Sequence, residues 1–278
     1  MTSLVAWIAT SPPNWNSVYL ASDSRISWNE DSGWNNGKKL FASRNDTDII
    51  GYCGEVLFPS QILSQIIEHI DSGLLFNDED TPQTKFDKIA SIVKQSFLSY
   101  PKAINSSNSV WANVNNVSIV YGTRQYLDGQ SVIYLWLLNW TKKTGWSESL
   151  LSLPLQSGLV EVFGSGKQVV KKYYGKWNKS EIKNTSRIVF GSFCDALKSG
   201  EDPRSGGAPQ LVSIRRKGSA QSFGVIYNNE RYLSGLLADQ ALLWEGIEWF
   251  NELFERCDGQ TKAVLKGAQH HARPHNIS

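Results

Sequence analysis

The stretch that decides the fold runs from Thr2-Ser-Leu-Val-Ala-Trp-Ile-Ala9, through a turn at 10–17, to Val18-Tyr-Leu-Ala-Ser-Asp-Ser-Arg25. Both apolar runs are short, and the turn between them is rich in Ser, Pro and Asn, so the pattern predicts a β-hairpin. Removal of Met1 would leave Thr2 with a hydroxyl and a free α-amino group. Because an α-amino group titrates near pH ~8 and can accept the hydroxyl proton, Thr2 is a candidate nucleophile that carries its own base.

Strand patterns and helix patterns alternate in groups along the rest of the chain. The further predicted elements are a strand at 48–52, helices at 58–70 and 86–97, strands at 117–121 and 132–138, helices at 167–177 and 186–199, and strands at 211–215 and 223–227. The segments 100–116 and 139–160 are interpreted as enlarged connections. Each helix has one apolar face that must be buried against another layer. The order therefore predicts an α+β fold, a four-layer αββα sandwich.

The last part of the chain has its own pattern. Apolar residues recur at helical spacing over 236–254, which predicts an appended amphipathic helix. A polar tail follows at 260–278. We therefore divide the chain into a domain at 1–234 and a C-terminal helix and tail at 235–278.

Composition narrows the function classes. The 278 residues are 41% hydrophobic, and 28 Lys and Arg against 26 Asp and Glu give a net charge of +2. This balance gives no basic footprint for nucleic acid or anionic membrane. The apolar run at 3–9 is too short to span a bilayer and no positively charged region precedes it, so we expect a cytoplasmic protein. Three scattered cysteines, Cys53, Cys194 and Cys257, indicate neither a disulfide framework nor a zinc site.

Further motifs follow Thr2 along the chain. They are Asp23-Ser24-Arg25, Lys39-Leu40 sixteen positions beyond Asp23, Gly54 after the third strand, Gly164-Ser165-Gly166, and Asp202-Pro-Arg-Ser205-Gly-Gly207. Each motif alone is weak, and an alternative interpretation makes Thr2 an ordinary residue, Asp23 a turn former and Lys39 a surface cation. Together, from Thr2 to about residue 234, they resemble the proteasome β-subunits and their bacterial relatives. Those proteins are N-terminal-nucleophile (Ntn) hydrolases of the threonine peptidase type.

The resemblance implies roles around the nucleophile. Thr2 Oγ1 would attack a carbonyl, and its own amine would accept the proton and later deliver it to the leaving group. Lys39 would supply positive charge that lowers the pKa of this amine. Asp23 would hold Lys39 charged and oriented.

The resemblance also implies a surrounding shell and a pocket. The residues that would form the hydrogen-bonded shell around the amine are Ser165, Asp202 and Ser205. The backbone N–H of Gly54 would stabilise the oxyanion. Tyr52 would fill the specificity pocket. In the alternative register Tyr52 points into the core and Glu55 shapes the pocket.

We therefore expect a threonine-type peptidase or amide hydrolase that acts on peptides or proteins without a metal or cofactor. The alternatives are a catalytically silent assembly or binding module and a small-molecule amidase on the same fold. The resemblance further implies self-association, often into rings, and sometimes pairing with an ATP-driven unfoldase. The apolar face predicted at 236–254 also favours a homo-oligomer.

Competing motifs are weaker. The run Gly164-Ser-Gly-Lys167 suggests a phosphate-binding loop, but Glu161 and Gln168 stand where that motif requires Gly and Ser or Thr. Cys53 is interpreted as a small buried residue, because its thiolate would need activation. Three closely spaced histidines in the polar tail are interpreted as solvated rather than metal-bound: His270, His271 and His275.

Overall fold

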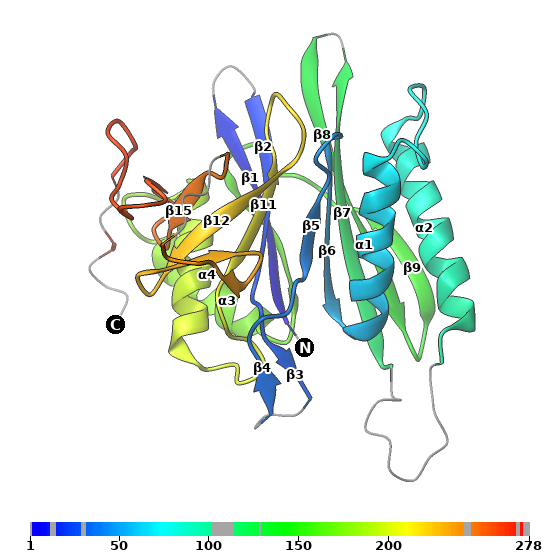
Figure 1. Cartoon of the computed structure of the whole chain (residues 1–278), viewed down its shortest axis with the longest axis horizontal. Coiled ribbons are helices and arrows are strands. Elements are labelled where there is room, and N and C mark those ends of the chain that lie inside the picture. The colour runs from blue at the N-terminus through cyan, green and yellow to red at the C-terminus, as the bar shows by residue number, and fades with distance from the viewer. Residues whose placement is uncertain are drawn as a thin grey trace.

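The computed structural model describes residues 2–11, 15–28, 32–101, 114–127, 129–241, 246–270 and 273–274. These residues form a mixed α/β structure with two large sheets and helix pairs α1–α2 and α3–α4 (Figure 1). Its ladders are antiparallel except for the β12–β15 pair, which is parallel. The predicted hairpin at the start of the chain is confirmed as β1 (Ser3–Ser11) and β2 (Trp15–Ser22).

The first sheet contains this hairpin. Its strand order is β10-β1-β2-β11-β12-β13-β14, and β15 and β16 extend it from β12. The other strands are β10 (Gly158–Gly164), β11 (Gln210–Ile214), β12 (Gln221–Tyr227), β13 (Glu230–Leu233), β14 (Leu236–Leu237), β15 (Trp249–Asn251) and β16 (Arg256–Cys257). The register pairs Ser3 with Gly164 and Leu4 with Ser22. The start of β1 therefore lies between the ends of β10 and β2.

The second sheet has the order β5-β6-β7-β8-β9. Its strands are β5 (Leu40–Ala42), β6 (Asp48–Gly54), β7 (Asn116–Leu127), β8 (Gln130–Thr141) and β9 (Gly145–Leu150). A small separate hairpin, β3 (Ile26–Ser27) with β4 (Gly33–Trp34), connects β2 to the segment that leads into β5.

Each sheet carries a helix pair on one face. Helices α1 (Leu57–Asp71) and α2 (Pro82–Ser99) lie against the second sheet, and α3 (Lys167–Trp177) and α4 (Ser186–Ser199) against the first (Figure 1). The start of α2 has a local cause, because the Thr81 hydroxyl accepts the Thr84 N–H at 3.1 Å and Pro82 fits the first turn.

Three larger apolar cores hold these elements together, and a smaller fourth one lies around β15 and β16. One joins the first sheet to α3 and α4, a second joins the second sheet to α1 and α2, and the third lies between the two sheets. Side chains that alternate along β1 contribute to two of these cores: Val5 and Trp7 face the helices, whereas Leu4 and Ala6 face the other sheet. A strand buried on both faces explains the continuous apolar run at 3–9.

The predicted helix at 236–254 is wrong. The described residues of this segment form β14 and β15, and residues 242–245 lie outside the described residues. Neighbouring side chains at its end face different cores, Trp249 toward Cys257 and Phe250 toward Phe223. That alternation belongs to a strand, and pairing with β12 outweighs the helical spacing of the apolar residues.

The segment 139–160 was expected to be a connection but contains β9 and the start of β10. The outer residues of β9 are exposed and polar, so this edge strand lacks an apolar signal. Of the other expected connection, residues 102–113 lie outside the described residues. No described helix combines the length and hydropathy needed to cross a bilayer.

Candidate active site at the start of β1

Thr2 lies directly before β1 and is fully buried. Its Oγ1 has no hydrogen-bond partner among the described residues. Leaving a buried hydroxyl unsatisfied costs about 1–3 kcal/mol, so such a group calls for a functional explanation.

A buried ion pair lies next to this strand start. Lys39 Nζ is 2.8 Å from Asp23 Oδ1, and both side chains have 0% exposure. Asp23 also accepts backbone N–H bonds from Ser3 at 3.0 Å, Arg25 at 3.1 Å and Gly206 at 3.0 Å. Burial lowers the pKa of Lys39, and the negative charge of Asp23 opposes this shift. Asp23 is therefore held rigidly and gives Lys39 its counter-charge.

Gln210 fixes the backbone on both sides of this ion pair. Its Nε2 donates to Asp23 O at 3.1 Å and to Gly37 O at 2.7 Å, and its Oε1 accepts the Lys39 N–H at 3.0 Å. No sequence pattern singles out Gln210, because it is a lone polar residue at the start of an apolar strand.

The predicted shell residues form a second cluster. Asp202 Oδ2 accepts from Ser165 Oγ at 2.8 Å and from Ser205 Oγ at 2.7 Å. Ser165 comes from the turn between β10 and α3, and Ser205 from the loop between α4 and β11. Two hydroxyls from different loops thus share one carboxylate oxygen of Asp202.

Ser3 joins the two clusters, and the sequence reasoning missed it. Its N–H donates to Asp23 Oδ1, and its Oγ lies 2.8 Å from Ser205 Oγ. A Cβ at position 166 would approach Ser3 Oγ to 1.8 Å, so Gly166 leaves the room that this bond needs. The one available signal was a polar residue at the head of an apolar strand.

Glycines let the chain start pack closely against both sheets. Gly164 has φ +90°, and a Cβ there would lie 1.7 Å from Thr2 O and 3.6 Å from Cys53 Cβ. Thr2 and Cys53, the neighbour of Gly54, therefore both lie at Gly164. Gly54 itself has φ +99°, and a Cβ would lie 2.6 Å from Asn116 O, so only glycine fits this strand end. Burial raises the pKa of Cys53 to about 11, which keeps its thiol protonated at neutral pH.

Tyr52 lies in the core between the second sheet and its helices. It has 0% exposure, its ring stacks on Phe41, and its hydroxyl donates to Lys38 O at 3.1 Å. This is the core orientation of the two that the sequence left open, because successive strand residues face opposite sides. Tyr52 therefore supports the backbone before Lys39.

Glu55 has a capping contact at the start of α1. Its Oε1 accepts the Leu57 N–H at 2.9 Å and the Tyr100 hydroxyl at 3.1 Å, and its Oε2 accepts the Phe58 N–H at 2.8 Å. Burial raises the pKa of this carboxyl. Its oxygens are used by the helix end, which limits any role in a pocket.

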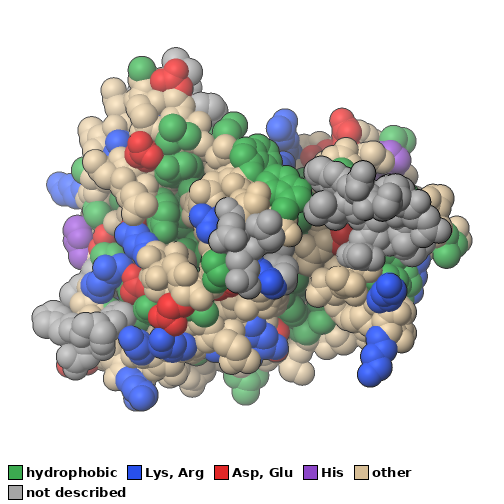
Figure 2. Space-filling model, turned by 90° about the horizontal axis from the view of Figure 1, so that it is seen from below, with side chains coloured by type: hydrophobic (Ala, Val, Ile, Leu, Met, Phe, Trp, Pro, Cys, Tyr) green, Lys and Arg blue, Asp and Glu red, His purple; other side chains and the backbone are tan. Residues whose placement is uncertain are grey.

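The small hairpin β3–β4 borders the site. Arg25 donates to Asn35 Oδ1 at 2.8 Å and to Pro203 O at 2.9 Å, so the hairpin is bound to the loop that carries Asp202. Trp28 and Trp34 are about half exposed, at 46% and 49%. Figure 2 views this end of the molecule, where hydrophobic side chains gather near the middle of the face.

A metal centre finds no support in the described residues, among which no three His, Cys, Asp or Glu side chains gather. His270 Nδ1 lies 3.7 Å from Glu255 Oε1, and His271 and His275 lie outside the described residues.

Comparison with known proteins gives a likeness in structure only. No protein-family model and no curated protein matches the chain. Among solved structures, eukaryotic HslV from Trypanosoma brucei aligns at 12% identity and TM-score 0.43, covering 76% of this chain and 99% of its own. Anbu (ancestral beta-subunit) from Yersinia bercovieri aligns at 13% identity and TM-score 0.49, and the alignment covers 80% of this chain and 86% of the Anbu chain. The Anbu (Gly-1) mutant from Hyphomicrobium sp. strain MC1 aligns at 13% identity and TM-score 0.47, and the alignment covers 80% of this chain and 88% of the mutant chain. At these identities and TM-scores the likeness assigns neither a family nor a function to this chain.

Proposed function

We propose that this chain is an N-terminal threonine hydrolase, a peptidase or amide hydrolase with the four-layer αββα fold of the Ntn hydrolases. The observation that carries the proposal is the buried hydroxyl of Thr2, which has no hydrogen-bond partner among the described residues. It lies beside Ser3, whose own bonds reach both the Asp23–Lys39 pair and the Asp202 cluster.

The proposed reaction begins when Met1 has been removed. Thr2 Oγ1 forms a bond to the substrate carbonyl carbon, and its proton passes to the α-amine of the same residue. The negative charge that develops on the carbonyl oxygen is stabilised by the Gly54 N–H, a contribution of about 3 kcal/mol for one donor in comparable enzymes. The ammonium then protonates the leaving nitrogen as the C–N bond breaks, which leaves an ester on Thr2. Water attacks this ester, and the amine accepts its proton and returns a proton to Oγ1.

The two clusters supply the electrostatics of this reaction. The positive charge of Lys39 disfavours a protonated amine and so keeps the base free at neutral pH. Asp23 holds this charge in a fully buried ion pair, and the Ser165–Asp202–Ser205 cluster offers hydroxyls and a carboxylate that orient the amine.

The substrate and partners of the proposed enzyme follow from the resemblance of its motifs. We propose peptides or proteins as substrates, a homo-oligomeric assembly, a cytoplasmic location and, as a further partner, an ATP-driven unfoldase. The helix that favoured self-association is absent, since β15 pairs with β12 inside the sheet. Sedimentation at micromolar concentrations tests the oligomer: a monomer throughout would remove the ring assembly.

A catalytically silent module is the second candidate. The observation that favours it is the complete burial of Thr2 in the full chain. A small-molecule amidase remains the alternative substrate class on the same site.

Turnover of fluorogenic peptide amides distinguishes these candidates. We expect activity in the wild type, none in Thr2→Ala, and a measurable fraction in Thr2→Ser, because Ser keeps both the hydroxyl and the amine. Equal rates for wild type and Thr2→Ala would place the chemistry elsewhere. No turnover of any peptide, with turnover of small amides, would favour the amidase.

A further inference from the structure

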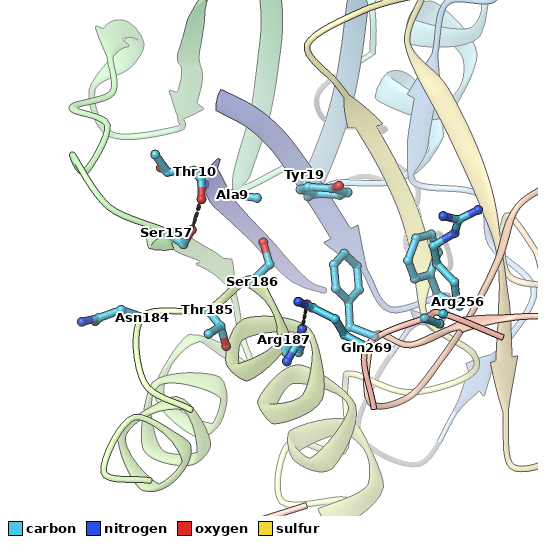
Figure 3. Close-up of a pocket in the computed structure, with 14 residues that line it drawn as sticks. Ala9, Thr10, Tyr19, Ser157, Asn184, Thr185, Ser186, Arg187, Arg256 and Gln269 are labelled. Carbon is cyan, nitrogen blue, oxygen red and sulfur yellow. Dashed lines mark hydrogen bonds between the residues drawn. The ribbon is translucent and has the colours of Figure 1, made fainter. Parts of the chain in front are cut away.

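A cavity of about 530 Å³ lies at the other end of β1 from Thr2 (Figure 3). Ala9 and Thr10 line it, so it is roughly 20 Å along the strand from the candidate active site. Its volume falls within the range of small-molecule sites. The catalytic proposal does not use this cavity.

Aromatic rings form one side of the cavity. Phe250 and Phe254 stack with ring centroids 4.8 Å apart, and Tyr19 meets Phe254 edge-on at 5.3 Å. Tyr19 and Phe250 belong to the buried core, whereas Phe254 is partly buried and presents its apolar edge or face to the cavity. This ring favours a flat apolar or aromatic group.

The charged side chains that line the cavity are positive. They are Arg187, on the first turn of α4, and Arg256 of β16, and no described lining residue is acidic. Arg187 donates to Gln269, and Figure 3 shows this pair at the cavity. Arg256 is 3.7 Å from Glu248, and Glu255 attracts Arg187 from outside the lining. The lining therefore favours an anionic group beside Arg187.

A hydroxyl at the opposite side also lacks a partner. Thr10 bonds to Ser157 through its backbone, with its N–H donating to Ser157 Oγ at 2.8 Å. Thr10 Oγ1 is buried and has no hydrogen-bond partner among the described residues.

We propose that this cavity is a binding site for a small aromatic carboxylate. The ring of the ligand lies against Phe254, and its carboxylate pairs with the guanidinium of Arg187, whose planar fork matches carboxylate geometry. Arg256 adds positive charge at the cavity rim.

Calorimetric titration with 2-naphthoate and with its neutral counterpart 2-naphthylmethanol tests the site. We expect saturable binding of 2-naphthoate, and binding of the alcohol weaker by about 10-fold or more, because a charge-assisted hydrogen bond is lost. Arg187→Gln should lower the affinity for 2-naphthoate by about the same factor and leave the affinity for 2-naphthylmethanol unchanged. Lys143→Gln, which removes an exposed cation from the β8–β9 turn, is the matched control and should change neither.

Equal affinity for the two compounds, no saturable binding of either, or an unchanged affinity in Arg187→Gln would overturn the proposal. Should Arg187→Gln fail to melt cooperatively, amide chemical shifts of the wild type give a second measurement. On addition of 2-naphthoate, the shifts should change at 184–187 and 250–254. Changes confined to other parts of the chain would contradict the assigned site.

Discussion

Ser3 and Asp23 exchange two hydrogen bonds: the Ser3 N–H donates to Asp23 Oδ1 at 3.0 Å, and the Asp23 N–H donates to Ser3 O at 3.1 Å. The same Oδ1 accepts from Lys39 Nζ. The residue after the proposed nucleophile is thereby fixed to the buried ion pair. This short path connects the backbone next to Thr2 with the side chain of Lys39.

Lys39→Met should lower the rate of peptide hydrolysis at neutral pH by about 10- to 1,000-fold, because a nearby charge shifts a pKa by 1–3 units. Without the positive charge, the pKa of the Thr2 amine rises and less free base is present. The acidic limb of the pH–rate profile should therefore move to higher pH, with activity recovering in alkali. The neighbouring Lys38→Met removes an exposed cation and serves as the control. A uniform loss with an unmoved profile would contradict the electrostatic role of Lys39.

Ser3→Ala should lower kcat more than it raises KM, since Ser3 positions the clusters and does not touch the substrate. Loss of the bond to Ser205 should also reduce stability by about 1 kcal/mol. Ser3→Thr restores a hydroxyl and should recover part of kcat. If the Thr and Ala variants show the same kcat, the Ser3 hydroxyl has no part in positioning.

Tyr52→Phe should lower the free energy of unfolding by about 1 kcal/mol through loss of the bond to Lys38 O, without changing the peptide cleavage profile. Tyr52→Gly should destabilise the protein by several times more, because a core ring is removed. Chemical unfolding measures the loss of stability in each variant, and a peptide-library profile measures its cleavage preference. A widened substrate range in a stable Tyr52→Gly protein would return Tyr52 to the pocket.

Asp48 predicts a pH effect on stability. It accepts the Tyr121 hydroxyl, lies 3.3 Å from Lys85 Nζ, and burial raises its pKa to about 6. The folded state thus binds the proton more tightly than the unfolded state, and stability falls as pH rises from about 4 to about 6. Two pKa units correspond to roughly 3 kcal/mol. Asp48→Asn should therefore gain up to that amount over wild type between about pH 4 and pH 7 in urea unfolding. A constant difference across this range would show that Asp48 does not titrate as described.

The sequence predicted elements best where apolar periodicity and end signals agree. The helices at 167–177 and 186–199 have the predicted bounds, and Gly200 at φ +66° marks the second end. The sequence-based prediction failed where pairing with another strand determines the secondary structure. Thus β15 is a strand because it pairs with β12. The edge strand β9 was missed because it carries too few apolar residues to be recognised.

The candidate site shows the same division. The family resemblance of the motifs implied Asp23 with Lys39 and a shell of Ser165, Asp202 and Ser205, and the structure brings each set together. Ser3 and Gln210 act through contacts with residues far away in the sequence, which no local pattern encodes.

Intact-mass measurement of the purified protein, with and without a peptide epoxyketone that reacts with the hydroxyl and amine of an N-terminal threonine, tests the central claim most directly. We predict a mass that lacks Met1 and a single adduct on wild type, no adduct on Thr2→Ala, and an adduct on Thr2→Ser. Fully retained Met1, or an adduct of equal yield on Thr2→Ala, would contradict the assignment of Thr2 as the nucleophile.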